Sequence, residues 1–327
     1  MNAEALAGWL PIRAYWRENR PWLDWCYLGT ERFREPFFEQ TLGVVVRQPF
    51  QAVFRHQTSI EFLGEFASRV ACPEPTGFIF HMSRCGSTLI TQMLAALPCN
   101  LVLSEPGPID WLLRSRLQKE SIPAEERMVW FQGLVRALGQ KRTPELRHYF
   151  IKFHSWHVVE LAFIRRAFPN VPWIFVERDP VEVMVSHQRQ RGAQMLPGAI
   201  DPRFLGLENT EWPTLSGDEF CARALGKICQ AVADQPGVVP DELVHYEELP
   251  EAVIARILPW FHVSFAEPEL DTMRSAAQFH AKNPKVHFVA DRESKQAEAT
   301  SDLRRWADQW ATPAYRRLED LRTRRGH

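Results

Sequence analysis

Apolar residues beyond about position 75 come in short runs that alternate with longer amphipathic stretches. Runs of this length are typical of buried strands, and the stretches between them have the spacing of helices. Strands and helices that alternate along a chain predict an α/β domain with a largely parallel sheet. The expected strands cover residues 78–82, 101–104, 149–153, 173–176 and 243–246.

Helices are predicted from the same pattern and from terminal signals. Apolar residues recur at spacings of one, three and four after the first expected strand, which puts them on one face of a helix that ends near Pro98. Ser216 and Glu219 have the spacing of a capping box at the start of another helix. The last expected helix is charged, and its arginines are interpreted as a solvated face. The expected helices cover residues 89–97, 158–168, 220–232 and 300–322.

The first 75 residues have a different composition, rich in proline and aromatic residues. We interpret them as a cap whose rings pack against the rest of the chain, with an acceptor-binding wall as the alternative. Residues 44–46 are a candidate for a short buried strand. The chain is therefore predicted to consist of a cap over residues 1–75 and a main domain over residues 76–327.

Charge, hydropathy and cysteine spacing narrow the range of partners. With 39 Lys and Arg against 40 Asp and Glu, the net charge of −1 leaves no global field that would attract nucleic acid or an anionic membrane. The N-terminus lacks a signal-peptide pattern, and no stretch approaches the roughly 18–20 apolar residues of a membrane span. A cytoplasmic protein is expected. The six cysteines lack paired or metal-ligand spacing, so reduced buried thiols and no metal site are expected.

Residues 77–94, GFIFHMSRCGSTLITQML, combine a strand, a tight loop and the start of a helix. Helix starts expose N–H groups with a partial positive charge, and small residues let phosphate oxygens approach them. Gly86 allows this approach, Ser87 and Thr88 supply hydroxyl donors and an N-cap, and Arg84 supplies a cationic fork. A plain capped helix is the alternative. Gly86 stands where a Walker A loop has lysine, which argues against nucleoside triphosphates.

The segment SRCGST, residues 83–88, resembles the P-loop-like motif PxRSGT/ST of the sulfotransferase superfamily. That motif binds the 5′-phosphosulfate of 3′-phosphoadenosine 5′-phosphosulfate (PAPS). The resemblance implies a P-loop-like three-layer α/β/α fold with a central, mainly parallel sheet, and PAPS as co-substrate. A thiol stands where the family usually has serine, so one hydroxyl contact is expected to be missing. The implied donor-binding residues here are Ser83, Arg84, Cys85, Gly86, Ser87 and Thr88.

The resemblance continues over residues 173–191, WIFVERDPVEVMVSHQRQR. Sulfotransferases place an arginine at the end of a strand and a serine eight residues later, where the two hold the 3′-phosphate of the donor. Arg178 and Ser186 have this spacing. A guanidinium and a hydroxyl so placed can reach one side of a phosphate. The alternative for Arg178 is an ion pair with Asp179 or Glu182.

Two further residues bring the motif layout nearest to the tyrosylprotein sulfotransferase type. Glu105, 21 positions after Arg84, stands where those enzymes carry a catalytic glutamate, and Lys152 stands where they carry a lysine that contacts the transferred group. A partly buried carboxylate whose pKa lies near the working pH can accept a proton from an acceptor hydroxyl. Arg84, Glu105 and Lys152 are thus the expected catalytic residues. A helix N-terminal acid is the alternative for Glu105, with His154 then acting as the base.

Two other segments match the family less specifically. Tyr246 begins a YExL stretch common in the superfamily, and we interpret it as structural. A basic loop that closes over the donor is expected further on, with a plain surface loop as the alternative. Its candidate residues are Lys282, Lys285, Arg292 and Lys295.

These features predict in-line transfer of a sulfuryl group from PAPS to a hydroxyl or amine of a small-molecule or peptide acceptor. Cationic side chains and a helix N-terminus oppose the charge in this scheme, so it requires no metal. The acceptor and the oligomeric state stay open. One alternative is an ATP-dependent P-loop kinase with Glu177 as a magnesium ligand. Another is a non-catalytic nucleotide-binding member of the fold.

Overall fold

A five-stranded parallel sheet forms the centre of the protein. The computed structural model describes residues 3–119, 122–207, 212–280, 283–287 and 291–324. The strand order is β5-β6-β4-β7-β8, and each neighbouring pair is parallel. Three of these strands are buried at every residue, which is why their central residues appear in the sequence as apolar runs. The strands are β4 Gly77–His81, β5 Asn100–Ser104, β6 His148–Lys152, β7 Trp173–Glu177 and β8 Leu243–His245.

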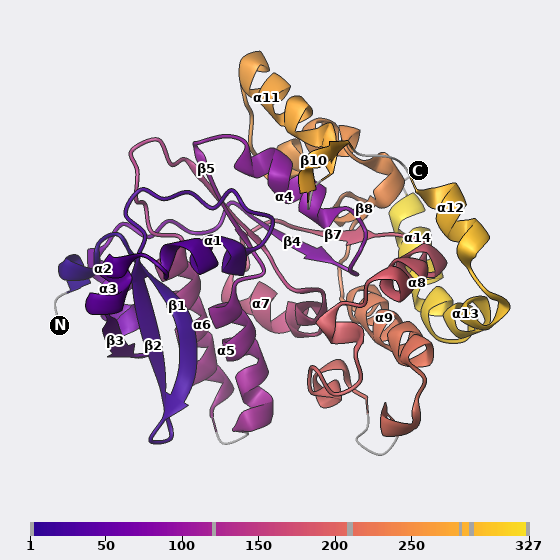
Figure 1. Ribbon diagram of the computed structural model, residues 1–327, viewed down its shortest axis with the longest axis horizontal. Helices are drawn as coiled ribbons and strands as arrows, with labels where there is room; N and C mark the ends of the chain where they lie inside the picture. Colours follow the sequence, from indigo (N-terminus) through magenta and orange to yellow (C-terminus); the bar gives the residue numbers. More distant parts are fainter. Residues whose placement is uncertain (1–2, 120–121, 208–211, 281–282, 288–290, 325–327) are drawn as a thin grey trace.

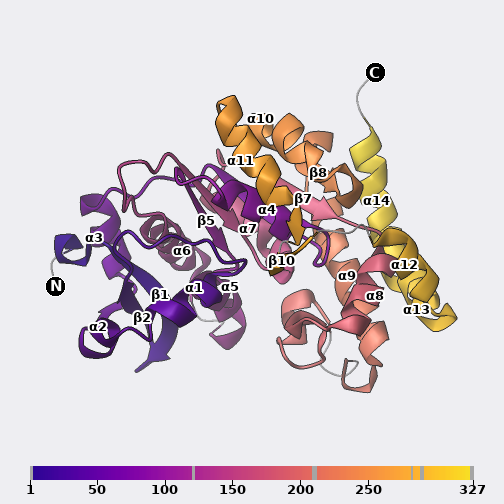
Figure 2. The same cartoon turned by 45° about the horizontal axis from the view of Figure 1, so that its top comes forward.

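Helices cover both faces of the sheet (Figure 1). Helices α4 and α11 lie on one face and α6, α7 and α9 on the other, and the tilted view in Figure 2 keeps this arrangement. The expected three-layer α/β/α architecture is confirmed, and each of the expected strands is found within one residue at either end. The helices are α4 Ser87–Ala95, α5 Gly107–Gln118, α6 Ala124–Leu138, α7 Leu161–Ala167, α8 Pro180–Arg189, α9 Gly217–Ala233, α10 Leu258–Trp260 and α11 Glu267–Ala277.

The helix predictions differ in how well they match. Helix α9 begins where expected, because the Ser216 side chain accepts a hydrogen bond from the backbone N–H of Glu219 at 3.1 Å. The helix expected over 158–168 is shorter, since Ser155–Glu160 winds as a 3₁₀-helix before α7. Two β-branched residues, Val158 and Val159, disfavour the α-helix there.

Residues 292–324 lie beyond the β8 edge of the sheet (Figure 1). The expected charged helix is confirmed as a continuous helical segment from Ser301 to Thr323, with a π-helical turn at Ala307–Ala311. A short antiparallel pair of strands precedes it. The elements are β9 Phe279–His280, β10 Asn283–His287, α12 Arg292–Glu298, α13 Ser301–Trp306 and α14 Thr312–Thr323.

The N-terminal segment folds into an antiparallel three-stranded sheet in the order β1-β2-β3, which the sequence did not predict. Helix α5 packs against β1, and helix α3 against α6. Trp9, Trp25, Phe33 and Phe38 are buried, as a packing cap requires. The domain boundary at residue 75 stays a prediction. The elements are β1 Trp9–Arg17, β2 Arg20–Tyr27, α1 Phe38–Val45, α2 Pro49–Val53, β3 His56–Ser59 and α3 Phe62–Arg69.

The strand expected over residues 44–46 is wrong. Val44 and Val45 form the last turn of α1, which has only one buried face. Val44 is 65% exposed, while Val45 is buried. A run of three valines therefore serves here as the end of an amphipathic helix.

Two other expectations concern cysteines and hydropathy. All six cysteines are free thiols, and five of them are buried, in agreement with the sequence. In the part of the chain that the structure describes, no helix has both the length and the apolar character needed to cross a bilayer.

Candidate functional site

A pocket of about 440 Å³ opens at the carboxyl ends of β4, β5 and β7. Because neighbouring parallel strands end at the same edge of a sheet, the residues that follow them meet there. Nine of the residues predicted for the site line this pocket. They are Ser83, Arg84, Cys85, Gly86, Ser87, Thr88, Glu105, Arg178 and Ser186.

The loop between β4 and α4 has a backbone that few residues adopt easily. Ser83, Arg84 and Gly86 all have positive φ, at 83°, 52° and 87°. Gly86 is the N-cap of α4, so the expectation that Ser87 caps this helix is wrong, and Ser87 is its first residue. A Cβ at Gly86 would lie 2.7 Å from Cδ1 of Leu249 and 3.0 Å from Cδ2 of Tyr246. The close approach that favours glycine here is therefore to the segment after β8.

Arg84 and Cys85 point in different directions. The Arg84 guanidinium donates to the carbonyl of Gln190 at 2.5 Å, just past α8, and burial lowers its pKa. The Cys85 thiol is buried and donates to the carbonyl of Val176 at 3.1 Å. Burial raises the pKa of Cys85 to about 11, so it is a neutral thiol directed at the sheet. A thiol that donates to the sheet supplies no hydroxyl contact to a ligand, in line with the expectation for this position.

His81, at the end of β4, is a pocket residue that the sequence analysis missed. Its Nδ1 accepts the backbone N–H of Ser83 at 3.1 Å, since an amide N–H can only donate. The proton of the neutral ring is therefore on Nε2, which donates to the carbonyl of Phe153 at 3.0 Å. Burial lowers the pKa of His81 and keeps the ring neutral. Its place in the sequence, at a strand end just before the loop, was the available signal.

A second histidine supports the loop from α8. Ser83 Oγ lies 3.1 Å from Nε2 of His187 and accepts from Nε2 of Gln194 at 3.0 Å. Nδ1 of His187 accepts the backbone N–H of Gly192 at 3.2 Å, which leaves the ring proton on Nε2. The Ser83 hydroxyl is thus held by two donors, and its own proton is free to point toward an acceptor.

Glu105 follows β5 and lies among one lysine and two histidines. Lys152 Nζ is 2.9 Å from Oε1, His154 Nδ1 is 3.1 Å from Oε2, and His81 Nε2 is 3.5 Å from Oε1. Glu105 itself has a φ of 60°. Three groups from the ends of β4 and β6 therefore converge on a carboxylate at the end of the neighbouring strand β5.

The charge state of Glu105 follows from these neighbours. Burial alone would raise the pKa of Glu105, but the charge of Lys152 and the contacts with His154 and His81 outweigh burial and hold the pKa well below its ordinary value. The expectation of a pKa near the working pH is therefore wrong, because the sequence did not show how many donors surround this side chain. Glu105 is an ionised carboxylate.

Lys152 lies beneath the pocket and contacts two of the residues that line it. It is fully buried and does not line the pocket, and its Nζ donates to Oγ1 of Thr88 at 3.3 Å in addition to its pair with Glu105. The ammonium also lies 4.8 Å from the centre of the Phe37 ring. A lysine so placed orients Glu105 and Thr88 and adds positive charge beneath the pocket.

Aromatic side chains form one wall of the pocket. One comes from the N-terminal segment, for which an acceptor-binding wall was the alternative interpretation, and the other was not predicted to line the pocket. Phe37 and Trp156 both line it. The Trp156 ring stacks on His154 with a centroid distance of 4.1 Å, and its Nε1 donates to Asp110 at 2.7 Å. Asp110 also pairs with His157 Nε2 at 2.9 Å. No sequence pattern predicts this contact, because it joins α5 to the segment after β6.

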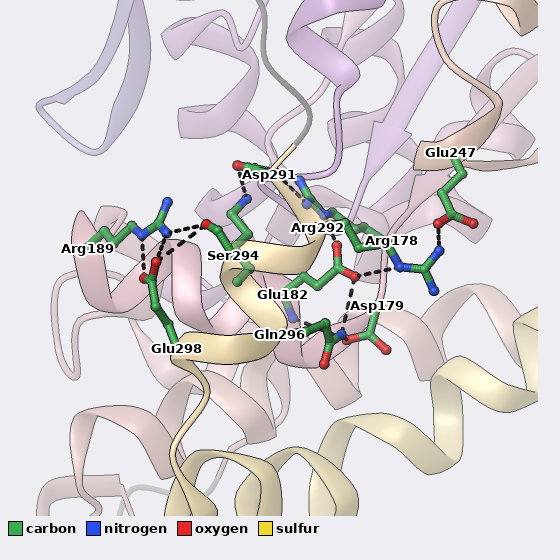
Figure 3. Close-up of polar contacts among 11 residues, drawn as sticks. Arg178, Asp179, Glu182, Arg189, Glu247, Asp291, Arg292, Ser294, Gln296 and Glu298 are labelled. Atoms are coloured by element: carbon green, nitrogen blue, oxygen red, sulfur yellow. Dashed lines mark hydrogen bonds and ion pairs between the residues drawn. The ribbon is translucent and has the colours of Figure 1, made fainter.

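Arg178, after β7, makes both the contacts of an ion pair and those of a pocket residue. Its Nε donates to Glu182 at 2.7 Å, which is one of the two ion pairs weighed as the alternative to phosphate binding. A second N–H group donates to Asp291 at 2.7 Å (Figure 3). The guanidinium also lies 3.8 Å from the centre of the Tyr246 ring. Tyr246, interpreted above as structural, lines the pocket.

Helix α12 carries one of the four basic candidates into the pocket. Lys295 lines it and pairs with Asp291 at 2.8 Å, with its side chain only 4% exposed. Arg292 lies outside, where it pairs with Glu247 and with Glu182 (Figure 3). Lys282 lies outside the described residues, and the side chain of Lys285 lies outside them too.

Glu177, the magnesium ligand of the kinase alternative, does not line the pocket. Its buried carboxylate lies 3.5 Å from Arg322 of α14. Burial, together with the nearby Glu319, raises the pKa of Glu177 well above its ordinary value. Arg322 therefore departs from the expected solvated face, and a carboxyl with a raised pKa that is buried beside α14, away from the pocket, is unsuited to bind magnesium.

Comparisons with known proteins gave matches among solved structures. No protein-family model matches the chain, and no curated protein matches it. The sulfotransferase domain of the Synechococcus PCC 7002 olefin synthase is 16% identical, over 74% of this chain and 96% of that chain, with a TM-score of 0.37. A sulfotransferase from Alicyclobacillus acidocaldarius is 16% identical, over 76% and 96%, with a TM-score of 0.40. A sulfotransferase from Mycobacterium avium is 14% identical, over 76% and 79%, with a TM-score of 0.41.

Likenesses this distant do not transfer an activity to this chain. The pocket has to be interpreted from its own residues, which combine a helix start, several cations, a buried carboxylate and an aromatic wall.

Proposed function

We propose that this chain is a sulfotransferase that moves a sulfuryl group from PAPS to a hydroxyl or amine of an acceptor. One observation carries the proposal. The start of α4 with Arg84, and Arg178 with Ser186, open into the same pocket beside Glu105. A nucleotide with anionic groups at both its 5′ and 3′ positions requires two anion-binding sites in one groove. A pocket of about 440 Å³ is within the usual range for small ligands.

The reaction forms one bond to sulfur and breaks another. The acceptor oxygen or nitrogen bonds to sulfur as the bond between sulfur and the 5′-phosphate oxygen breaks, and the products are the sulfated acceptor and adenosine 3′,5′-bisphosphate. Negative charge grows on the departing phosphate oxygen. Arg84 and the N-terminus of α4 stabilise this charge directly, and Lys152 adds positive charge through Thr88.

Glu105 accepts the proton that the acceptor loses. Its low pKa makes it a weak base, but an acceptor hydroxyl becomes strongly acidic as its bond to sulfur forms, so a weak base suffices late in the reaction. Glu105 lines the pocket, whereas His154 lies behind it at 3.1 Å from Oε2. His154 therefore acts here as a positioning residue for Glu105.

The aromatic wall is the proposed binding surface for the acceptor. Phe37 and Trp156 offer flat apolar faces next to Glu105, which suits an acceptor with a ring. The positions of Glu105 and Lys152 resemble those of the tyrosylprotein type, which favours a phenolic hydroxyl on a small molecule or a peptide.

The test detects any product that takes up the labelled sulfuryl group, so the acceptor need not be known beforehand. The purified chain is incubated with PAPS labelled in its sulfuryl group and with an extract of small molecules and peptides from its own cells, and labelled products are identified. We expect transfer by the wild type and a loss on the order of 10²-fold in rate for Glu105→Gln. The matched control is Glu74→Gln, because Glu74 pairs with Arg136 at the surface, away from the pocket, and the variant keeps full rate.

Other outcomes point to the alternatives. Tight binding of adenosine 3′,5′-bisphosphate with no labelled product indicates a non-catalytic nucleotide-binding protein. Transfer of label from the γ-phosphoryl group of ATP in the presence of magnesium indicates a kinase. Equal rates for the wild type and Glu105→Gln contradict the role assigned to Glu105.

A further inference from the structure

The surroundings of Arg178 contain as many carboxylates as cations. Arg178 pairs with Glu182 and Asp291, and Asp291 also pairs with Lys295, at distances of 2.7 to 2.8 Å (Figure 3). The nearby Arg292 has a partner of its own in Glu247. Arg178 and Lys295 are both buried, so each needs an anion close by. The two cations are thus neutralised by the protein itself.

The two carboxylates are not equivalent. Glu182 is part of α8, its side chain is 4% exposed, and it does not line the pocket. Asp291 lines the pocket, and its side chain is 36% exposed. Asp291 is therefore the anion that shares the cavity with a ligand and can turn toward water.

The side chain of Asp291 also does not cap its own helix. It is the N-cap of α12, where an aspartate commonly accepts a hydrogen bond from the first turn, yet its side chain makes no capping bond. Its carboxylate contacts Arg178 and Lys295 instead.

Helix α12 has other contacts with α8 and the segment before it. Gln296 donates to Asp179 and Glu182 at 3.2 Å, and Arg189 pairs with Glu298 (Figure 3). The side chain of Asp291 can therefore move without releasing the helix.

We infer that Asp291 is an exchangeable internal counter-ion that occupies the position of the donor's 3′-phosphate and leaves it when the nucleotide binds. This inference rests on the proposed function. A phosphate monoester carries a charge of about −1.5 to −2 and three acceptor oxygens, so it outcompetes a single carboxylate for Arg178 and Lys295. When the bisphosphate product departs, Asp291 returns to the two buried cations, which lowers the cost of release. The role of Asp291 is to weaken binding of the product and speed its dissociation.

The test compares two nucleotides that differ only in the 3′-phosphate. The dissociation constants of adenosine 3′,5′-bisphosphate and of adenosine 5′-monophosphate are measured by calorimetry for the wild type and for Asp291→Asn. We expect the variant to bind the bisphosphate about tenfold more tightly, a typical size for coupling between two ligands, and to release it more slowly. Affinity for the monophosphate stays unchanged, because that ligand does not displace Asp291.

Glu298→Gln is the matched control. It removes a carboxylate from the same helix but from a pair outside the pocket, and it changes neither affinity. Thermal melting shows that the variants fold, and Asp291→Asn melts lower than the wild type without nucleotide, because the buried Lys295 loses its carboxylate partner and Arg178 loses one of two.

The outcomes separate the two proposals. If the wild type prefers the bisphosphate and Asp291→Asn binds it no more tightly than the wild type does, then Asp291 is a fixed support for Arg178 and the inference is wrong. If the wild type shows no preference for the bisphosphate over the monophosphate, then the donor itself is wrong, and the inference fails with it.

Discussion

The loop before α4 holds three residues at positive φ, of which only Gly86 is a glycine. For Ser83 and Arg84 this conformation costs roughly 1–2 kcal/mol each. Contacts elsewhere have to hold it, and Ser83 has them from His81, His187 and Gln194. Strain kept in place by several partners is typical of sites where backbone N–H groups are aligned for a ligand.

Gly86→Ala tests whether this loop is tied to the segment after β8. The new Cβ would clash with Leu249 and Tyr246 as well as adopt an unfavourable φ. We expect the free energy of unfolding to fall by about 2 kcal/mol or more and affinity for adenosine 3′,5′-bisphosphate to fall with it. Denaturant titration and calorimetry measure the two effects.

Gly237→Ala is the matched control for that variant. Gly237 has a φ of 75° but nothing within 4 Å of an added Cβ, so it reports the backbone cost alone, about 1 kcal/mol. Equal losses of stability in the two variants, with nucleotide affinity kept in both, would show that the contact between Gly86 and Tyr246 is unimportant.

Pocket residues were predictable from the sequence where they belong to a motif. Nine of the ten predicted site residues line the pocket, and Lys152 lies directly behind it. His81 and Asp291 were missed, because neither belongs to a motif and each reaches the pocket only through the fold. Phe37 was covered only by the alternative that residues 1–75 form an acceptor-binding wall. The pKa of Glu105 was misjudged for the same reason, since its donors come from separate strands.

At the scale of elements, the parallel strands were the most predictable part of the fold. A strand buried on both faces is largely apolar, here with polar residues only at its ends, and such runs are easy to recognise. The N-terminal hairpin was not predicted, because β1 and β2 have only one buried face and each contains a proline. Tertiary contacts, rather than local propensity, decide that these residues form strands.

The buried His157, where the 3₁₀-helix Ser155–Glu160 contacts α5, gives a pH-dependent stability. Burial lowers the pKa of His157 to about 4, while an unfolded chain titrates near 6.5. Between these values the unfolded chain binds more protons, so acidification through this window destabilises the fold. The full contribution is present above about pH 6.5, and roughly 3 kcal/mol is lost by about pH 4.

His157→Gln measures that contribution, since glutamine keeps an amide donor for Asp110 but takes up no proton. We expect the free energy of unfolding to fall less steeply between pH 6.5 and 4 in this variant than in the wild type, as determined from urea titrations. The exposed His262→Gln serves as the control and keeps the wild-type slope. A wild-type slope in His157→Gln would mean that other groups titrate in this window.

On the scale of the whole molecule, the pocket is assembled from distant parts of the chain. Phe37 comes from the N-terminal segment, Glu105 and Arg178 from the ends of central strands, and Asp291 and Lys295 from the segment at the start of α12. Sequence motifs located the central part of the pocket, because a P-loop and a strand-end arginine are local features. No motif located its two outer walls: an acceptor-binding wall in residues 1–75 was only an alternative, and the basic loop had four candidate residues. The positions of both walls depend on packing between segments more than 100 residues apart.

Because both anion sites belong to one pocket, the protein should respond as a whole to the nucleotide that fits them. We expect adenosine 3′,5′-bisphosphate to raise the melting temperature without magnesium. At a hundredfold excess over its dissociation constant it adds about 2.7 kcal/mol to the free energy of unfolding. Adenosine 5′-monophosphate at the same concentration stabilises less, because Asp291 continues to neutralise Arg178 and Lys295.

ATP with magnesium is the discriminating ligand in the same melting experiment. A P-loop kinase is stabilised by ATP only when magnesium is present, because the metal bridges the terminal phosphates and a carboxylate of the protein. Here the carboxyl of Glu177 is buried beside Arg322 and is away from the pocket, so magnesium should add nothing to the effect of ATP. Stabilisation by magnesium and ATP that exceeds the effect of the bisphosphate would contradict the proposed donor. It would also require Glu177 to leave its buried position beside α14.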